Sequence, residues 1–278
     1  MKKSLIGFWL LILPICLVGQ GRNNTWLLGN DPGWPNIGRI IFYTFSYQLL
    51  TEQRKMAFKG TEATISDETG NFLMSSNGVW IANANNDTMM NGSGLNPGNY
   101  VNSWQDGLPI INGNIILPFP ADSSKYILFH QTGEPTLNGL STELFYSKID
   151  ILLDGGLGST ISKNNVVLSD SISWGLASCK HANGRDWWII LSKDSTDIFY
   201  TILLTDSGIN AVTTQNLNFT PLPHEGIVQH TFSQDGTKFI TTTYDNPVSR
   251  NSYLVISDFD RCTGLFSNTQ TLQLSSGS

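Results

Sequence analysis

A repeated unit of turn and strand constrains the fold of this chain more than any other feature. Four turns rich in Asp, Gly, Ser and Asn each lead at once into a run dense in aromatic and β-branched residues. The runs begin near Phe72, Tyr126, Trp187 and Phe239, which lie 54, 61 and 52 residues apart. Such runs are typical of β-strands, and no window of helical length carries a sustained 3.6-residue apolar stripe. The sequence therefore predicts an all-β protein built from repeats.

The last three repeats continue with a second strand and a glycine-containing turn. The second strands are predicted at residues 143–151, 198–204 and 253–259, and the turns at 154–156, 206–208 and 261–264. A period of about 50 to 60 residues with about four strands per unit is typical of β-propeller blades. A sandwich of irregular strands is the alternative. The regular order of turn, strand, long loop, strand and turn favours a β-propeller with four to five recognisable blade units.

Residues 181–186, just before Trp187, raise the question of acid–base chemistry because they contain His181, Arg185 and Asp186. No serine or cysteine nucleophile with a recognisable motif lies nearby. The segment occupies the same place in its repeat as residues 235–237 occupy in the last one. We therefore expect a turn between two strands rather than a reactive site.

Tryptophans are candidates for stacking on sugar rings wherever they are exposed. The adjacent Trp187 and Trp188 point to opposite faces of a strand. Because neighbouring blades cover both faces of an internal blade, we expect this pair to pack in the core. Trp104, in the long Gly- and Asn-containing loop 91–107, is the better candidate for a displayed ligand contact.

Histidines and paired carboxylates are the remaining candidates for chemistry. His224 and His230 would lie about 20 Å apart on a straight strand at ~3.3 Å per residue, and His130 is expected to be a hydrogen-bonded residue at a strand end. The carboxylate pairs, which match neither a calcium loop nor an identifiable glycosidase pair, are Asp194/Asp197, Asp258/Asp260 and Asp150/Asp154. We therefore predict no catalytic residue, no metal site and no cofactor. Whether Cys179 and Cys262 form a disulfide is left open.

The first residues have the pattern of a secretory signal peptide. Lys2 and Lys3 precede an uncharged apolar stretch, residues 5–18, and Gly19 follows. This stretch is shorter than the ~20 residues that a membrane-spanning helix needs. An uncleaved N-terminal anchor is the alternative. We predict a signal peptide over residues 1–20, export of the chain, and no membrane span after cleavage.

The charge of the chain argues against a nucleic-acid partner. The formal net charge is −6, and charged residues make up 14% of the sequence, against about 25% in an average protein. Nucleic-acid binding depends on clustered Lys and Arg that displace counterions from phosphates. The sequence contains no such cluster.

Six segments of the chain carry a family resemblance. They are residues 65–72, 77–83, 89–98, 153–158, 180–188 and 259–264. In this order they resemble a β-propeller region at the N-terminus of secreted and cell-surface proteins of the Bacteroidota, over roughly residues 24 to 270. The resemblance implies a surface-displayed or released protein with further blades, downstream modules and a C-terminal sorting domain for type IX secretion. It brings no assigned catalytic residues.

The resemblance also shapes the expected domain organisation. The chain stops at Ser278, after a turn that leads towards another strand. We expect residues 21–278 to be an incomplete, truncated propeller region that continues beyond this end, and a complete ring of four or five blades is the alternative.

Together these features predict an exported, cell-surface β-propeller that serves as a binding or display scaffold without catalysis of its own. Its role would be adhesion or contact with an extracellular polymer, and its ligand an extracellular glycan or protein. An exported propeller enzyme of the lactonase, lyase or glycosidase kind and a purely structural spacer are the alternatives.

Overall fold

The computed structural model describes residues 21–29, 37–133, 140–219, 228–244 and 252–274. The predicted signal peptide, residues 1–20, and residues 275–278 lie outside these segments. None of the described helices is long and apolar enough to cross a membrane.

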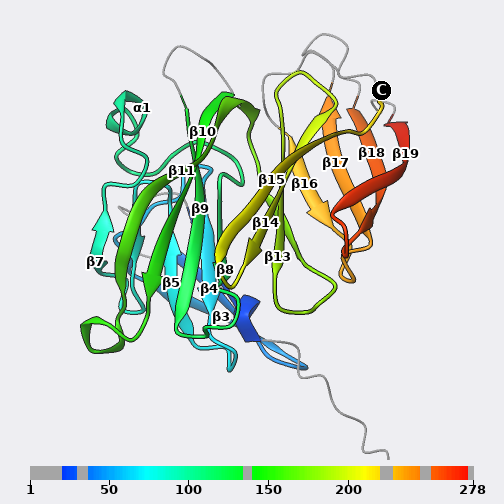
Figure 1. Ribbon diagram of the computed structural model, residues 1–278. Coiled ribbons are helices and arrows are strands. Elements are labelled where there is room, and N and C mark those ends of the chain that lie inside the picture. The colour runs from blue at the N-terminus through cyan, green and yellow to red at the C-terminus, as the bar shows by residue number, and fades with distance from the viewer. Residues whose placement is uncertain (1–20, 30–36, 134–139, 220–227, 245–251, 275–278) are drawn as a thin grey trace, which may run out of the picture.

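Most of the described elements are β-strands, which form sheets in the order of the sequence (Figure 1). The first sheet contains β1 (Thr25–Leu27), β2 (Ile37–Phe42) and β3 (Tyr47–Glu52). The second contains β4 (Ala63–Ser66), β5 (Phe72–Ser76), β6 (Trp80–Ala82) and β7 (Thr88–Ser93). The third contains β8 (Asn114–Pro118), β9 (Lys125–Gly133), β10 (Leu140–Asp150) and β11 (Ser159–Ser173), and the pairing of β11 with β7 joins the second and third into one eight-stranded sheet.

Two further four-stranded sheets complete the described part of the chain. The fourth contains β12 (Ala177–Lys180), β13 (Trp187–Ser192), β14 (Ile198–Thr205) and β15 (Gly208–Asn216). The fifth contains β16 (Gln229–Phe232), β17 (Lys238–Tyr244), β18 (Ser252–Asp260) and β19 (Leu265–Leu274). The described helical elements are short, namely η1 (Gly21–Asn23), α1 (Asn99–Asn102) and η2 (Asp154–Gly156).

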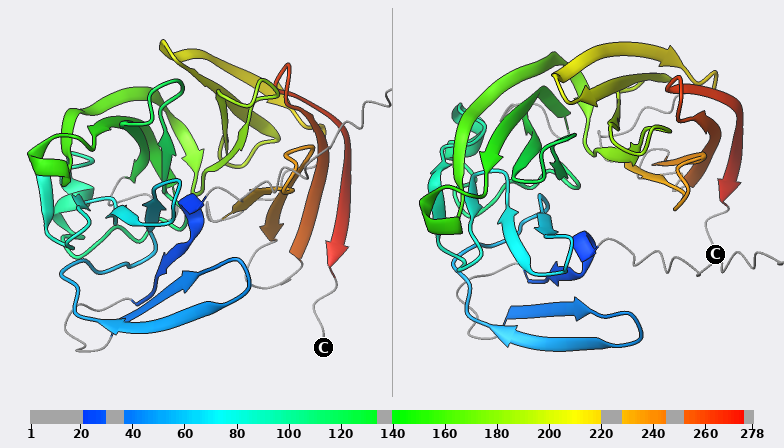
Figure 2. Two further views of the ribbon diagram at one scale, coloured as in Figure 1. Left: turned by 90° about the horizontal axis from the view of Figure 1, so that it is seen from below. Right: turned by 60° about the horizontal axis from the view of Figure 1, so that its bottom comes forward.

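The sheets are arranged as the blades of a β-propeller. Figure 2 shows them side by side around an arc, with the first strand of each blade on the inside and the last on the outside. The inner strands β4 and β8 contact each other, as do β12 and β16. Within each blade, consecutive strands pair antiparallel, and one parallel pair, Ser159 with Met90, joins the outer strands β11 and β7. The predicted all-β propeller with four to five blade units is confirmed.

The repeat in the sequence corresponds to one strand in each of the last four blades. Phe72, Tyr126, Trp187 and Phe239 lie in β5, β9, β13 and β17, which are the second strands of their blades. The segments predicted at 143–151, 198–204 and 253–259 overlap β10, β14 and β18, which are the third strands. Each repeat of the sequence therefore corresponds to one blade, and equivalent residues occupy equivalent strands.

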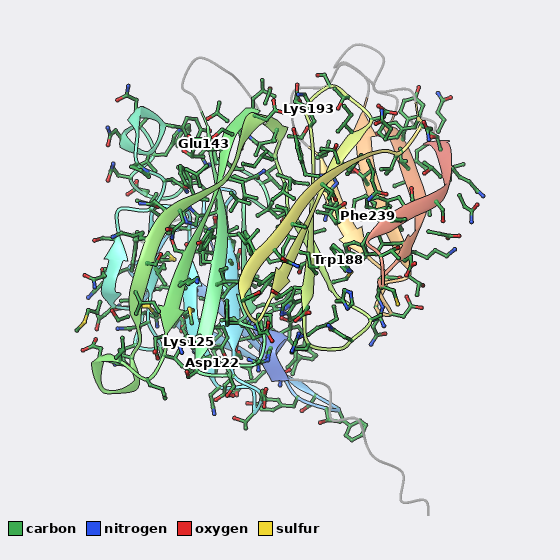
Figure 3. All side chains as sticks on the ribbon, in the orientation of Figure 1. Asp122, Lys125, Glu143, Trp188, Lys193 and Phe239 are labelled. Atoms are coloured by element: carbon green, nitrogen blue, oxygen red, sulfur yellow. The ribbon has the colours of Figure 1, made fainter. Side chains whose placement is uncertain are left out.

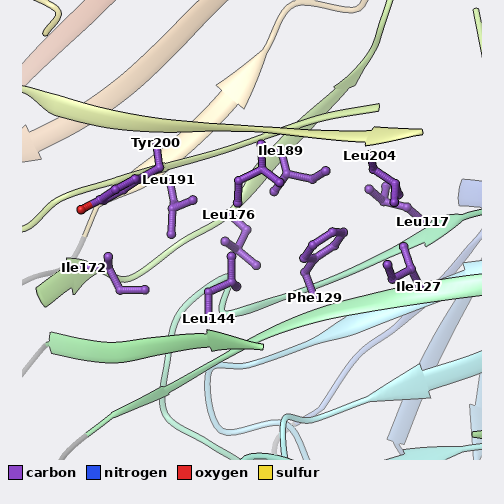
Figure 4. Close-up of a cluster of buried hydrophobic side chains, with 11 residues drawn as sticks. Leu117, Ile127, Phe129, Leu144, Ile172, Leu176, Ile189, Leu191, Tyr200 and Leu204 are labelled. Carbon is purple, nitrogen blue, oxygen red and sulfur yellow. The ribbon is translucent and has the colours of Figure 1, made fainter. Parts of the chain in front are cut away.

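Hydrophobic cores lie between blades. Figure 4 shows the cluster between the third and fourth blades, to which Leu117, Ile127, Phe129, Leu144, Ile172, Leu176, Ile189, Leu191, Tyr200, Ile202 and Leu204 contribute. Equivalent clusters join the second blade to the third and the fourth to the fifth. Burying one large apolar side chain stabilises a fold by about 1.5–3 kcal/mol. Stability therefore depends on each blade packing against its neighbours.

The double tryptophan connects the fourth blade to both of its neighbours. The indole Nε1–H of Trp187 donates to the carbonyl oxygen of Pro118 in the third blade at 3.0 Å. The Nε1–H of Trp188 donates to the carbonyl oxygen of Arg261, after the third strand of the fifth blade, at 2.8 Å. Trp188 belongs to the core between the fourth and fifth blades, and Trp187 packs against the core on the other side. The expectation of core packing is confirmed for Trp188, whereas Trp187 is only half-buried.

Candidate functional site

Three adjoining cavities lie along the inner strands of the propeller. The axial cavity, of about 500 Å³, is lined by residues 176–180 of the fourth blade, residues 230–234 of the fifth, and Ile115, Trp187, Gly236 and Arg261. A second cavity, of about 410 Å³, runs along β4 and β8 and shares Ile115, Ser178 and Trp187 with the first. A third cavity, of about 290 Å³ and termed here the mouth, is lined by the turns that follow β4, β8 and β12 and also contacts Lys180. Inner strands of several blades line these spaces, which therefore lie at the propeller axis.

Lys180 is the last residue of β12, and alternation along this strand separates it from the buried core. Ala177 and Cys179 are buried between the fourth and fifth blades, whereas Ser178 and Lys180 are half-buried. The Lys180 Nζ lies 3.8 Å from the centre of the Trp187 ring and donates to the carbonyl oxygen of Arg185 at 3.1 Å. Burial, reinforced by the charge of Arg22 and opposed by Asp186, lowers the pKa of Lys180 to about 8.

Arg261 reaches the same cavity from the turn between β18 and β19. Its carbonyl oxygen accepts hydrogen bonds from the Trp188 indole at 2.8 Å and from the backbone N–H of Ala182 at 3.1 Å, so two contacts from the fourth blade hold this turn. Its side chain lies against Gly236, where an added Cβ would come within 2.8 Å of the Arg261 Cδ. Because Gly236 has no Cβ, the Arg261 side chain can occupy this space.

Lys180 and Arg261 differ from the other cations around the cavities because neither forms an ion pair with a described carboxylate, although the charge of Asp186 acts on Lys180. Around the mouth, Arg22 pairs with Glu68 at 2.5 Å, and Arg185 pairs with Asp186 at 2.8 Å and with Asp206 at 2.9 Å.

Lys125, at the start of β9, also has a partner close to the mouth. It pairs with Asp122, and both side chains lie at the end of the third blade in Figure 3. None of the described residues that line the axial cavity carries a carboxylate. The axial cavity is consequently a positively charged region in a chain of net charge −6.

The second cavity contains one acid among its described lining residues. Glu62, directly before β4, lines this cavity and keeps part of its side chain exposed. Desolvation by the surrounding protein raises the pKa of its carboxyl group to about 7, and the charge of Arg54 opposes this effect. Burial raises the pKa of the Cys179 thiol to about 12, so this thiol stays protonated at neutral pH and is a poor nucleophile.

The segment 181–186 is a turn between β12 and β13, as predicted. The His181 Nδ1 accepts a hydrogen bond from the backbone N–H of Asn183 at 3.0 Å, and its Nε2 lies 3.1 Å from the carbonyl oxygen of Cys262. Asp186 is buried and accepts hydrogen bonds from Asn183 and Arg185. These side chains hold the turn and attach it to the fifth blade.

The other histidines are occupied by structural contacts or lie outside the described residues, as His224 does. His230 is buried, with Ser192 Oγ 3.2 Å from its Nε2 and Thr241 Oγ1 2.9 Å from its Nδ1. His130 is fully buried between Asn96 Oδ1 at 2.7 Å and Ser147 Oγ at 2.9 Å, and burial lowers its pKa to about 3. The prediction that His130 is hydrogen-bonded is confirmed, but it lies in the interior, within β9, rather than at a strand end.

The carboxylate pairs take part in local contacts. Asp258 pairs with Lys238, and Asp260 accepts from the backbone N–H of Cys262 at 2.8 Å. Three carboxylates of the remaining pairs accept hydrogen bonds within or next to turns: Asp150 from the backbone N–H of Leu152, Asp194 from the hydroxyl of Ser195, and Asp197 from the backbone N–H of Asn218. In the described segments, no group of three or more His, Cys, Asp or Glu side chains is placed to hold a metal ion.

Two further questions raised by the sequence concern Trp104 and the two cysteines. Trp104 follows α1 and is 40% exposed, and its role as a ligand contact stays a prediction. Cys179 is buried, Cys262 is exposed, and both are free thiols. The sequence did not single out Lys180, Arg261 or Glu62 as site residues, because each resembles an ordinary residue at the end of a strand.

Comparisons with known proteins show low similarity throughout. No protein-family model and no curated protein matches the sequence. A proposed 6-phosphogluconolactonase from Bacteroides uniformis is 11% identical with a TM-score of 0.46, over 88% of this chain and 67% of that one. The dihydro-heme d1 dehydrogenase NirN is 11% identical with a TM-score of 0.45, over 91% and 46%. A variant of AofleA from Arthrobotrys oligospora is 10% identical with a TM-score of 0.42, over 91% and 72%. The chain thus spans about half of the dehydrogenase, and the propeller assignment depends on the strand topology described above.

Proposed function

We propose that this protein is an exported, cell-surface binding module that holds part of an extracellular polymer in its axial cavity and has no catalysis of its own. The observation that carries the proposal is the axial cavity itself. Its volume of about 500 Å³ lies within the ~300–1,000 Å³ typical of ligand pockets. It combines the aromatic rings of Trp187 and Phe232 with the polar groups of Ser178, Gln234 and Lys180.

The proposed lack of catalysis is supported by the state of the nearby reactive groups. The Cys179 thiol is protonated, and His230 is buried in hydrogen bonds to Ser192 and Thr241. An exported enzyme is the rival, and Glu62 favours it because its pKa of about 7 suits a general acid or base. A glycosidase needs a second carboxyl group, and Glu62 is the sole acid among the described residues that line the second cavity.

A panel of extracellular polysaccharides tests the binding proposal, with affinity measured by biolayer interferometry on the full chain. Ser178→Trp fills the axial cavity and is expected to abolish binding. Thr271→Trp, at an exposed position on β19, is the matched control and is expected to bind as the wild type does. Binding that survives in a folded Ser178→Trp variant would place the ligand elsewhere, and absence of any binding would refute the proposal.

Turnover of the bound polymer separates the module from an enzyme. The proposal expects no new reducing ends and no change in polymer mass after prolonged incubation. Cleavage that disappears in Glu62→Gln would establish the rival enzyme instead.

A further inference from the structure

We infer that the axial cavity binds an anionic group of its ligand, with Lys180 and Arg261, which both line it, as the cations. The inference rests on the proposed function and names the chemistry of the ligand. A carboxylate of an acidic sugar and a sulfate or phosphate ester share this chemistry, since each presents several oxygens that accept charged hydrogen bonds.

The charge of the lining residues carries the inference. Lys180 and Arg261 both line the axial cavity, and the described lining residues include no acid. The nearby cations Arg22 and Arg185 are instead paired with carboxylates. Neither cation forms an ion pair with a described carboxylate, although the charge of Asp186 acts on Lys180. A half-buried charge outside an ion pair is unfavourable, and an entering anion relieves that cost. The pocket is thus complementary to negative charge in an otherwise acidic protein.

Both cations retain hydrogen-bond donors for a ligand. An ammonium group has three N–H donors and a guanidinium has five. The Lys180 ammonium makes one hydrogen bond, to the carbonyl oxygen of Arg185. Within the described part of the chain, the Arg261 guanidinium makes none. Neither group needs to break an ion pair before it binds an anion.

The scaffold fixes the bases of the two side chains and leaves their charged ends available. The Arg261 backbone is held by Trp188 and Ala182 of the neighbouring blade. The Lys180 backbone is held in strand β12, and its ammonium lies over the Trp187 ring. Such preorganisation reduces the conformational entropy that is lost on binding. Ser178 and Gln234 line the same cavity and offer partners for the hydroxyl groups of an acidic sugar.

Affinities of the full chain for three soluble polymers test the inference, measured by biolayer interferometry at pH 7 and physiological salt. The probes are polygalacturonate, which carries carboxylates, dextran sulfate, which carries sulfate esters, and neutral dextran. We expect at least one anionic probe to bind and neutral dextran not to bind. The two anionic probes distinguish the carboxylate source from the ester source.

Charge-neutral substitutions identify the residues that hold the anion. Lys180→Gln and Arg261→Gln are each expected to lower the affinity for the anionic probe by about tenfold or more, which corresponds to the loss of a charged hydrogen bond. Arg261→Lys should recover part of the loss. Lys59→Gln removes the same charge from an exposed residue away from the cavity and is expected to change affinity by less than about twofold. Circular dichroism confirms that each variant is folded.

The outcomes distinguish this inference from the proposed function. If neutral dextran binds as tightly as the anionic probes and Ser178→Trp abolishes that binding, the cavity is a ligand site and the anion inference is wrong. If an anionic probe binds but Lys59→Gln weakens it as much as Lys180→Gln does, the attraction is diffuse and the inference is again wrong. If no probe binds, the anion inference is wrong, and the polysaccharide panel decides the proposed function separately.

Discussion

Trp188 offers the sharpest test of how the blades hold together. Its side chain is buried between the fourth and fifth blades, in edge contact with Phe259 and directly against Gly264. Truncation of a buried tryptophan to alanine costs about 3–5 kcal/mol. At roughly 2–4 °C per kcal/mol for a chain of this size, we expect Trp188→Ala to lower the Tm by about 6–20 °C.

Trp188→Phe separates the hydrogen bond from the packing. Phenylalanine keeps most of the apolar contact and loses the Nε1–H bond to Arg261. The Arg261 carbonyl still accepts from Ala182, so it is not left without a partner. We therefore expect Trp188→Phe to cost about 1 kcal/mol for the hydrogen bond, together with a smaller packing loss.

Thermal unfolding followed by circular dichroism measures both variants. Trp104→Ala is the control, because a 40% exposed side chain is expected to change stability by no more than about 0.5 kcal/mol. If the free energy of unfolding of Trp188→Ala lies within about 1 kcal/mol of the wild-type value, packing of the fourth blade on the fifth through Trp188 does not stabilise the fold.

Three further predictions concern backbone strain and pH. Gly264 and Gly184 share a φ of +73°, but only at Gly264 would an added Cβ meet the Trp188 ring, at 2.7 Å. We therefore expect Gly184→Ala to lower the free energy of unfolding by about 1–2 kcal/mol and Gly264→Ala to lower it clearly more. Urea unfolding measures both variants, and equal losses would be inconsistent with the Trp188 contact. His130 has its pKa lowered by burial to about 3, below its unfolded value of ~6.5. The stability that the neutral His130 ring contributes is therefore complete above pH ~6.5 and is lost as pH falls toward 3. Over this range the free energy of unfolding should fall by up to ~1.4 kcal/mol per pH unit, and this pH dependence should be weaker in a folded His130→Gln variant. Lys180 is charged below its pKa of about 8 and faces Arg22 and Asp186, so anion affinity should fall as pH rises from 7 to 9 in the wild type and less steeply in Lys180→Gln.

Much of the fold was accessible from short stretches of sequence. The turn residues before Tyr126 and Trp187 have local backbone preferences that predict a turn followed by a strand, and the distance along the chain between such turns predicts the length of a blade. The opposite directions of Trp187 and Trp188 followed from alternation along one strand. His130 was placed correctly as hydrogen-bonded but not as buried, because Asn96, from the loop before α1, closes over it.

The sequence by itself determined the class of architecture, since strand and turn preferences are encoded in neighbouring residues. The tertiary structure alone decided which side chains share the axial cavity. Lys180 and Arg261 lie 81 residues apart and come from different blades, and nothing in the sequence near either one shows that it forms no ion pair. Whether a charge is paired depends on which turns the stacking of blades brings together, and that stacking is set by the interblade cores.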